Sequence, residues 1–506
     1  MTDKKERPKR QDFSPLDAHH RRGKVFTPPL MRVSDNIELH SWHSERLPET
    51  LWAVLLSATL PRADSLQLLS AVAKAAMQFR EHPEVFPAHS ALAGISKEQF
   101  AALFADVLKD KSACSALSPL LLLDSLPDRA HWAAHLPTSV VEEGWNAMAE
   151  AVAACLDPRS RPAIDVRWLR VMFLGLQHRL MIKKEDDEIV DMLCAYPTGK
   201  DVPDWADAMI GSMEPMVGIG FDGAARPNWS EDFWRDCLKG TPCVVARYMP
   251  PVPEAEFPYE EAKTRWGQIY AGLMKHFFQT LRNTGIDARH DAVFGLALYA
   301  MSLVTGMMRP HSTRPSGRHL LRSLAEANIT LAYLVFRDDP EIWKMYRAYG
   351  TGQAKLAFLK LVETEREDLP RHVDVALLER LANEDMWQEY VSIDVGHWAG
   401  LTARKMADDA GVKDVYDKFY VWPSGFVHGQ WAAVRDSVFD LCANPLHRFH
   451  RVPRPMRVDM PDVCFDAVRL MNRILGLVDQ AFPSFALRFD ETSHSARATA
   501  PTAASE

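Results

Sequence analysis

The stretch Leu47–Leu60, with the sequence LPETLWAVLLSATL, decides the fold class of this chain. Its apolar residues recur at spacings of three and four, which is the period of one face of an α-helix. The stretch Asp64–Phe79, DSLQLLSAVAKAAMQF, repeats this pattern. Runs of alternating β-branched residues longer than about five are scarce along the chain, so strands have little support. The sequence therefore predicts an all-α protein.

Helical periodicity continues on both sides of a proline-rich segment, Met249–Glu261. Proline lacks a backbone donor and disfavours helix in the residue before it, so this segment predicts a domain boundary. On its N-terminal side we expect further helices at Ser96–Leu108, Val140–Leu156, Asp165–Met181 and Asp204–Met213. On its C-terminal side we expect helices at Trp266–Arg282, Ala292–Met308, His319–Phe336, Ile342–Thr364, Val373–Asp394, Trp398–Asp409 and Asp462–Ala481.

The length of 506 residues is sufficient for about two or three domains. Residues 1–30 are rich in lysine and arginine and are predicted to form a disordered basic arm, and residues 491–506 a disordered tail. Between these ends we predict an N-terminal helical domain at 31–248, a linker at 249–261 and a C-terminal helical bundle at 262–490.

The composition excludes several classes of protein. Fifty-nine lysines and arginines against 67 acidic residues give a net charge of −8, unlike a generic nucleic-acid binder, although a local basic patch stays open. The seven cysteines are dispersed, which argues against a disulfide framework and favours a reducing cytoplasm. The stretch Ala292–Met308 is uncharged, but its length of about 17 residues falls short of a bilayer core. We therefore expect a buried helix there and no membrane partner.

Two local motifs resemble ligand sites without the context that such sites need. Gly218–Gly223 spells G-x-G-x-x-G, but a helical run precedes it and Pro227 follows, so a loop is favoured over a phosphate cradle. His447 and His450 lie three residues apart in a basic, proline-rich stretch, where a solvated pair is favoured over a zinc or iron site. We expect no metal and no cofactor.

Two pieces of the C-terminal half place charged residues on predicted helices. Arg322 and Glu326 lie one helical turn apart in a largely apolar run, and they form either a structural salt bridge or a functional pair. The second piece begins at His397-Trp398 and places Arg404 in the middle of a helix that ends near Gly411. Alone, this second piece is typical of an amphipathic surface helix.

The third piece is Trp422–Trp431, with the sequence WPSGFVHGQW. Pro423 is expected to end the preceding helix, Ser424 to cap the next one, and His428 to follow one turn later on the same side. His428 is either a satisfied core histidine or a general acid/base, and the residues leave both interpretations open.

Together these three pieces resemble the bacterial family called domain of unknown function 5677, over Arg282–Phe439. The positions that match the family's motifs are Arg322, Glu326, Trp398, Gly400, Arg404, Ser424 and His428. Members of this family are α-helical and their setting points to anti-phage defence, so the resemblance implies both for this chain. It also implies a distant likeness to HEPN-type helical RNases, although their spacing of Arg and His is absent around His428.

On this resemblance we expect an abortive-infection effector of anti-phage defence whose C-terminal bundle binds RNA and acts as a metal-independent ribonuclease. His428 would be the general acid or base, Arg322 and Arg404 would hold phosphate, and Ser424 and Glu326 would orient the histidine. The alternative is a non-catalytic sensor or scaffold that binds a phage or host protein or a small nucleotide. The residues alone leave open whether the protein is an enzyme, and in either case we expect a cytoplasmic homo-oligomer.

Overall fold

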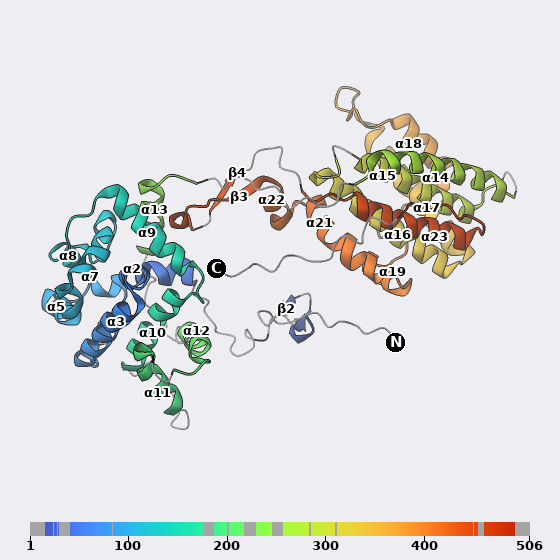
Figure 1. The fold of residues 1–506 in the computed structure, drawn as a ribbon. Helices are drawn as coiled ribbons and strands as arrows, with labels where there is room; N and C mark the ends of the chain where they lie inside the picture. The colour runs from blue at the N-terminus through green and yellow to red at the C-terminus, as the bar shows by residue number, and fades with distance from the viewer. Residues whose placement is uncertain are drawn as a thin grey trace. The chain divides into compact units, whose positions relative to one another are not determined.

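The protein is described here from a computed structural model. It describes residues 16–23, 25–27, 29, 41–82, 84–176, 187–199, 202–216, 229–244, 257–282, 285–308, 311–448, 450–453 and 460–490. Helices dominate these residues, and the strands in them form two-stranded sheets, β1 (His20–Arg22) with β2 (Val25–Thr27) and β3 (Phe439–Leu441) with β4 (Arg451–Pro453) (Figure 1). The all-α prediction is confirmed.

The chain divides into two compact units. The N-terminal unit comprises Met1–Ala246 and Leu441–Val452, and the C-terminal unit comprises Arg247–Asp440 and Pro453–Glu506. Residues 441–452, which the sequence analysis places in the C-terminal domain, therefore pack with the N-terminal unit. Their Leu446 is fully buried in the N-terminal core, which accounts for this return of the chain.

The N-terminal unit is built from short helices around an aromatic core. Trp52 and Phe104 meet edge to face with ring centroids 4.8 Å apart, and Trp132 donates to a buried Asp128 that also binds His89. Its α-helices are α1 (Leu47–Glu49), α2 (Leu51–Thr59), α3 (Arg62–Ala76), α4 (His89–Leu92), α5 (Lys97–Leu103), α6 (Ala105–Lys109), α7 (Lys111–Leu117), α8 (Arg129–Ala133), α9 (Val141–Leu156), α10 (Arg161–Leu176), α11 (Asp187–Ala195), α12 (Ala206–Met216) and α13 (Trp229–Gly240). Single-turn helices are η1 (Leu16–Ala18), η4 (Met77–Phe79), η5 (Ser118–Leu122), η7 (Tyr196–Thr198) and η10 (Pro445–His447), with a π-helix at η3 (Trp42–Arg46).

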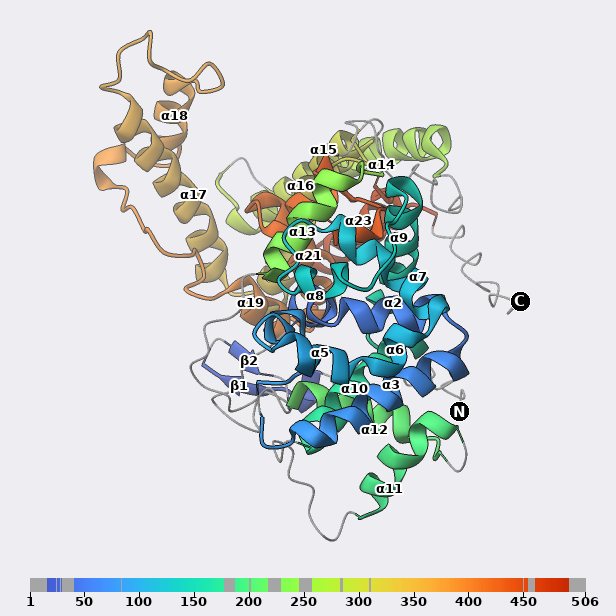
Figure 2. The same ribbon diagram turned by 90° about the vertical axis from the view of Figure 1, so that its left-hand side faces the viewer.

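The C-terminal unit centres on three long helices, α15 (Ala288–Met307), α16 (Pro315–Arg337) and α23 (Cys464–Ala481), which pack against one another (Figure 1). Their apolar faces meet in a core that includes the fully buried Met301, Leu324 and Ile474. The remaining helices are α14 (Tyr259–Thr280), α17 (Pro340–Leu361), α18 (Val375–Ala382), α19 (Ala403–Asp409), α20 (Lys413–Val415), α21 (Val421–Val427) and α22 (Trp431–Val438), with the single turn η8 (Gln388–Tyr390) and the π-helix η9 (Tyr416–Tyr420). Figure 2 shows α17 and α18 as a hairpin that extends away from α15, α16 and α23.

The uncharged stretch Ala292–Met308 falls in α15, where most of its side chains are buried, as the sequence predicts for a core helix. Across the described ranges, no helix combines the length and the apolar character that crossing a bilayer requires.

Two predicted helices are shorter than expected. The expected helix at Val373–Asp394 ends at Ala382, because the Asn383 side chain donates to the Glu379 carbonyl and accepts from the Gln388 N–H, which turns the chain. The expected helix at Trp398–Asp409 begins only at Ala403, because Gly400 adopts φ +63° and Thr402 caps the helix. Gly411, with φ +69°, follows the end of α19 as predicted.

Within the expected basic arm, His20–Arg22 and Val25–Thr27 pair as an antiparallel hairpin in which Gly23 adopts φ +61°. A glycine meets no steric penalty at that turn. Several other predictions fall wholly or largely outside the described residues. These are the G-x-G-x-x-G stretch at 218–223, the linker residues 249–256 and the tail at 491–506.

The α17–α18 hairpin gives the first testable prediction. Arg347 of α17 donates to both carboxylate oxygens of Asp385, at 3.0 and 2.7 Å, and also pairs with Asp291 of α15. The hydrogen bonds from Arg347 hold the pKa of Asp385 below its ordinary value of 3.8. Arg347→Met should lower the free energy of unfolding of the C-terminal unit at pH 7 by about 1–3 kcal/mol, because the carboxylates of Asp291, Glu384 and Asp385 lose their partner.

A carboxyl group whose pKa is lower in the folded than in the unfolded protein stabilises the fold fully when the pH is above its unfolded-state pKa. This stabilisation is lost as the pH falls through the folded-state pKa. The difference between wild type and Arg347→Met should therefore be full at pH 7 and shrink below about pH 4, as measured by urea unfolding with hydrogen exchange at α17. Lys344→Met removes an exposed pair on the same helix and should change little. An effect of equal size at pH 7 and pH 3 would contradict this assignment.

Candidate functional site

Two of the predicted site residues, Glu326 and Ser424, meet at a third, Arg322. The guanidinium of Arg322 donates from Nη1 to Glu326 Oε2 at 2.5 Å, from Nε to Ser424 Oγ at 3.3 Å, and from Nη2 to the hydroxyl of Tyr420 at 2.7 Å. It also lies over the Tyr420 ring, 4.5 Å from the centroid. The Arg322 side chain is 16% exposed. An arginine this far from water is stabilised when its charge and its donors have partners, and here they do.

Tyr420 and Ser424 reach Arg322 because the chain stays helical from the π-helix η9 into α21. The prediction that Pro423 ends a helix and Ser424 caps the next one is wrong, since both lie inside α21. Ser424 instead donates to the Tyr420 carbonyl at 2.7 Å, so its oxygen is turned toward Arg322.

The other end of α21 is fixed to α16 by a histidine. His319 Nε2 lies 3.1 Å from the carbonyl oxygen of Phe426 and donates a hydrogen bond to it. Burial raises the pKa of Tyr420, and the nearby Glu326 carboxylate adds to this, so the phenol keeps its proton while it accepts from Arg322. We call Arg322, Glu326, Tyr420 and Ser424 the arginine cluster.

His428 lies at the C-terminal end of α21, where its backbone N–H donates to the Ser424 carbonyl at 3.1 Å. Its side chain is exposed, so the interpretation as a core histidine is wrong. Within the described residues its imidazole forms no hydrogen bond, and neither Ser424 nor Glu326 reaches it. No hydrogen bond in the described residues therefore supports the expected role of Ser424 and Glu326 in orienting His428. Gly429, with φ +58°, turns the chain directly afterwards.

Arg404 lies in the first turn of α19, not in the middle of a helix, and is exposed. In the part of the chain that the structure describes, its guanidinium has no ion pair. Trp398 precedes α19 and is buried against Tyr333 and Tyr346, with ring centroids 6.0 and 5.2 Å away. Trp398 and Gly400 therefore shape the turn before α19, whereas the exposed side chain of Arg404 is accessible to a ligand.

An open pocket of about 460 Å³ lies beside the arginine cluster, between α15, α16, α17 and the turn at His397-Trp398. Its lining includes Glu326, Tyr299, Tyr346, Tyr349, His397 and Trp398. Burial raises the pKa of Tyr346. The lining holds no lysine or arginine, and its two carboxylates, Glu326 and Asp291, are already paired with Arg322 and Arg347. The pocket therefore favours a neutral aromatic ligand over a phosphate.

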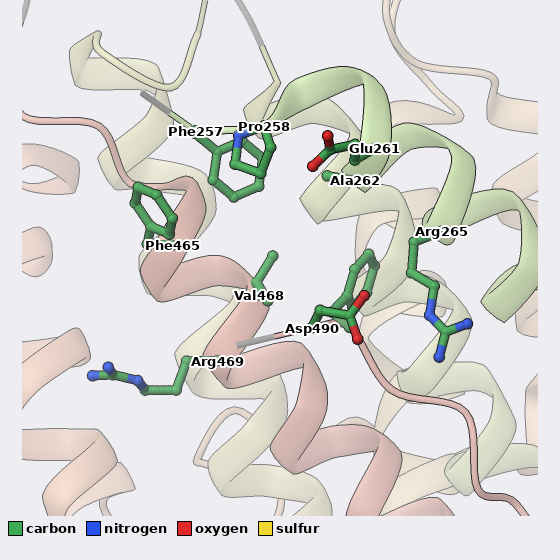
Figure 3. Close-up of a pocket in the computed structure, with 10 residues that line it drawn as sticks. Phe257, Pro258, Glu261, Ala262, Arg265, Phe465, Val468, Arg469 and Asp490 are labelled. Atoms are coloured by element: carbon green, nitrogen blue, oxygen red, sulfur yellow. The ribbon is translucent and has the colours of Figure 1, made fainter. Parts of the chain in front are cut away.

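A second pocket lies between the start of α14 and α23 (Figure 3). Phe257 and Phe465 meet edge to face there with ring centroids 5.0 Å apart, and Glu261, Arg265 and Asp490 also line the pocket. Its volume is about 80 Å³, well below the roughly 300–1,000 Å³ of a small-molecule site. None of the predicted site residues lines it.

The seven positions that match the motifs lie within one continuous segment of the chain. They are Arg322, Glu326, Trp398, Gly400, Arg404, Ser424 and His428. Residues 308–443 match the model of a family of unknown function, DUF5677. The DUF5677 segment holds all seven positions and confirms the resemblance, although it starts later than the expected Arg282. No curated protein and no solved structure matches the chain.

Sequence reasoning missed Tyr420 and His319, which link the DUF5677 helices α16 and α21. Both contacts join residues about 100 positions apart, and no local spacing marks such a contact. It also missed that Cys243 and Cys442 lie beside His447 and His450 in the N-terminal unit.

The arginine cluster gives a second prediction. Arg322→Ala removes three donors at once and leaves Tyr420 and Glu326 without their partner, which costs about 1–3 kcal/mol. Hydrogen exchange measured by mass spectrometry should become roughly 5- to 150-fold faster across Tyr416–Val427, because these residues lose their attachment to α16.

Arg404→Ala is the matched control, since it also removes an arginine of the DUF5677 segment but no internal hydrogen bond. It should leave exchange at Tyr416–Val427 unchanged. If Arg322→Ala also left this exchange unchanged, the cluster would not be what holds α21 in place.

Proposed function

We propose that the C-terminal unit binds RNA and cleaves it without a metal ion, as a cytoplasmic effector of bacterial anti-phage defence of the abortive-infection type. One observation carries the RNA proposal: His428 is exposed on a stretch that also exposes Trp422 and Trp431, at 53% and 63%. The defence role rests on the resemblance of the DUF5677 segment to its family.

Exposed tryptophans on both sides of a histidine suit single-stranded RNA. Large aromatic side chains are normally buried, so two exposed ones close together in sequence indicate a binding surface. Bases stack on such rings at about 1–3 kcal/mol per base, whatever the base is. Arg435 of α22 is also exposed and supplies positive charge for the backbone.

The chemistry assigned to this site needs one acid/base group and a charge stabiliser. His428 is the only imidazole in Trp422–Trp431, and its exposed ring can accept the proton of a ribose 2′-hydroxyl. Arg404 is the better phosphate ligand of the two predicted arginines, because the guanidinium of Arg322 already serves three internal acceptors. Arg322, Glu326 and Ser424 then act as positioning residues for α21.

The proposal extends to partners. A homo-oligomer would bring two copies of His428 to one RNA, so that one copy acts as acid and the other as base. A phage or host protein would act as the trigger. Gel filtration with light scattering tests the first point, and affinity capture from infected and uninfected cells tests the second.

The third prediction concerns RNA directly. With a fluorescent single-stranded RNA, Trp422→Ala and Trp431→Ala should each weaken binding by about 5- to 150-fold, through lost stacking. His428→Ala should lower the rate of RNA cleavage by about 100-fold or more with little change in binding, because it removes proton transfer. Phage plating should show loss of protection for the same variant.

His372→Ala, an exposed histidine away from α21, is the control and should behave as wild type. Circular dichroism and soluble protein level check that each variant folds. Cleavage and protection that both persist in His428→Ala would end the catalytic proposal, and RNA affinity that persists in both tryptophan variants would end the binding proposal.

A second candidate function is favoured by the pocket beside the arginine cluster. We propose, as the alternative, a non-catalytic sensor in which this pocket binds a small aromatic compound. Tyr346 and Trp398 form an aromatic wall, and the paired state of Glu326 and Asp291 leaves no free charge for a phosphate. A nucleoside or base fits this chemistry better than a nucleotide.

The fourth prediction tests this alternative by isothermal titration calorimetry. Nucleosides should bind more tightly than the matching nucleoside monophosphates, and His397→Ala should weaken that binding by about 5-fold or more through a lost hydrogen bond. Trp422→Ala, outside the pocket, should not change it. Stronger binding of the monophosphates, or no binding of either class, would remove the sensor proposal.

A further inference from the structure

Four possible metal ligands converge in the N-terminal unit, and the inference drawn from them is independent of the RNA proposal. They are Cys243, just after α13, and Cys442, His447 and His450, in the returning segment Leu441–Val452. One ligand atom from each lies within 4.8 Å of all the others. The described cysteines are all free thiols.

The individual distances match tetrahedral coordination. Cys243 Sγ lies 3.3 Å from His450 Nε2, and Cys442 Sγ lies 3.4 Å from His447 Nδ1. With Zn–S near 2.3 Å and Zn–N near 2.0–2.1 Å, a tetrahedral ion places sulfur and nitrogen ligands about 3.6 Å apart. The side chains are thus close to the spacing that an ion would impose.

The surroundings also orient the ligands as a metal site does. His447 Nε2 lies 3.2 Å from the Thr241 carbonyl and donates to it, so its Nδ1 lone pair faces the cluster. Such a hydrogen bond from the second ring nitrogen is the usual partner of a metal-bound histidine. The backbone N–H of Val244 donates to Cys442 Sγ at 3.4 Å, which stabilises a thiolate.

Two members of this cluster are buried, whereas a solvated pair of histidines is expected from the sequence. His447 is 5% exposed and Cys442 is fully buried, so that interpretation is wrong for His447. A buried Cys442 is a poor nucleophile because substrate cannot reach it, which argues against catalysis by the Cys442–His447 pair.

We propose that Cys243, Cys442, His447 and His450 bind one zinc ion in a structural site. Two thiolates and two imidazoles are a ligand set that zinc prefers, and four protein ligands leave no position open for a substrate. The expectation of a chain without metal is replaced by this proposal.

The ion would fasten the returning segment to the rest of the N-terminal unit. It would join Cys243 to ligands that follow it by about 200 positions, and closing so long a loop removes much conformational freedom from the unfolded chain. The same segment is anchored by Asn444, which donates to Thr241 Oγ1 and to the Pro242 carbonyl at 2.9 Å. Zinc and Asn444 thus act on the same junction.

The fifth prediction is tested with the full-length chain, purified without chelator from zinc-supplemented medium. Inductively coupled plasma mass spectrometry should find about one zinc per wild-type chain, as expected for a four-ligand site. Cys243→Ser and His450→Asn should each lower zinc affinity by more than the roughly 10- to 100-fold that loss of an outer partner costs. Cys194→Ser, an exposed cysteine outside the cluster, should keep its zinc.

Cys243 and His450 are chosen because neither is fully buried, and circular dichroism checks that both variants stay helical. Should they unfold, the wild-type chain decides the question: Co²⁺ added to the chelated protein should give the visible absorption of a tetrahedral thiolate site. Absence of both zinc and this absorption, a Cys243–Cys442 disulfide in the purified protein, or full zinc content in both folded variants would overturn the proposal.

Discussion

The guanidinium of Arg322 is the constraint on which the surroundings of His428 depend. It lies on α16, a helix of 23 residues at the centre of the C-terminal unit, and serves acceptors on α16, η9 and α21. Because the three acceptors point along different directions, they hold the planar guanidinium in one orientation. α21 is thereby fixed at Ser424, and His319 fixes it again at Phe426. The short helix that presents His428 is held by these contacts together with the burial of Pro423 and Phe426.

Helical periodicity predicts the long helices well, because the apolar residues on the buried face of an amphipathic helix recur every three or four positions in the sequence. Val141–Leu156 matches its expected range within one residue. The ends of helices and the turns between them leave a weaker signal in the sequence. The helix start at Ala403 depends on a glycine turn and a threonine cap, and the arrest of α18 depends on the Asn383 side chain, so both are decided by hydrogen bonds that periodicity does not encode.

The candidate site was only partly accessible from sequence for the same reason. Arg322 and Glu326 are neighbours on one helix face, and their pairing follows from a spacing of four. Tyr420 joins them from about 100 positions further along the chain, and Cys243 meets Cys442 across about 200. Contacts of that separation depend on the tertiary fold, and one sequence carries no local signal for them. The distinction between an exposed and a buried histidine, which separates His428 from His447, likewise appears only when neighbours are placed.

The return of Leu441–Val452 to the N-terminal unit also bears on how the chain is made. During translation most of that unit emerges first, but Leu446, a fully buried part of its core, is synthesised only after roughly 195 more residues. At about 5–20 residues per second this interval lasts roughly 10–40 s. Throughout that time the apolar site for Leu446 beside α9 and α13 stays uncovered on the ribosome. The nascent chain therefore exposes an apolar surface that the finished protein covers with Leu446.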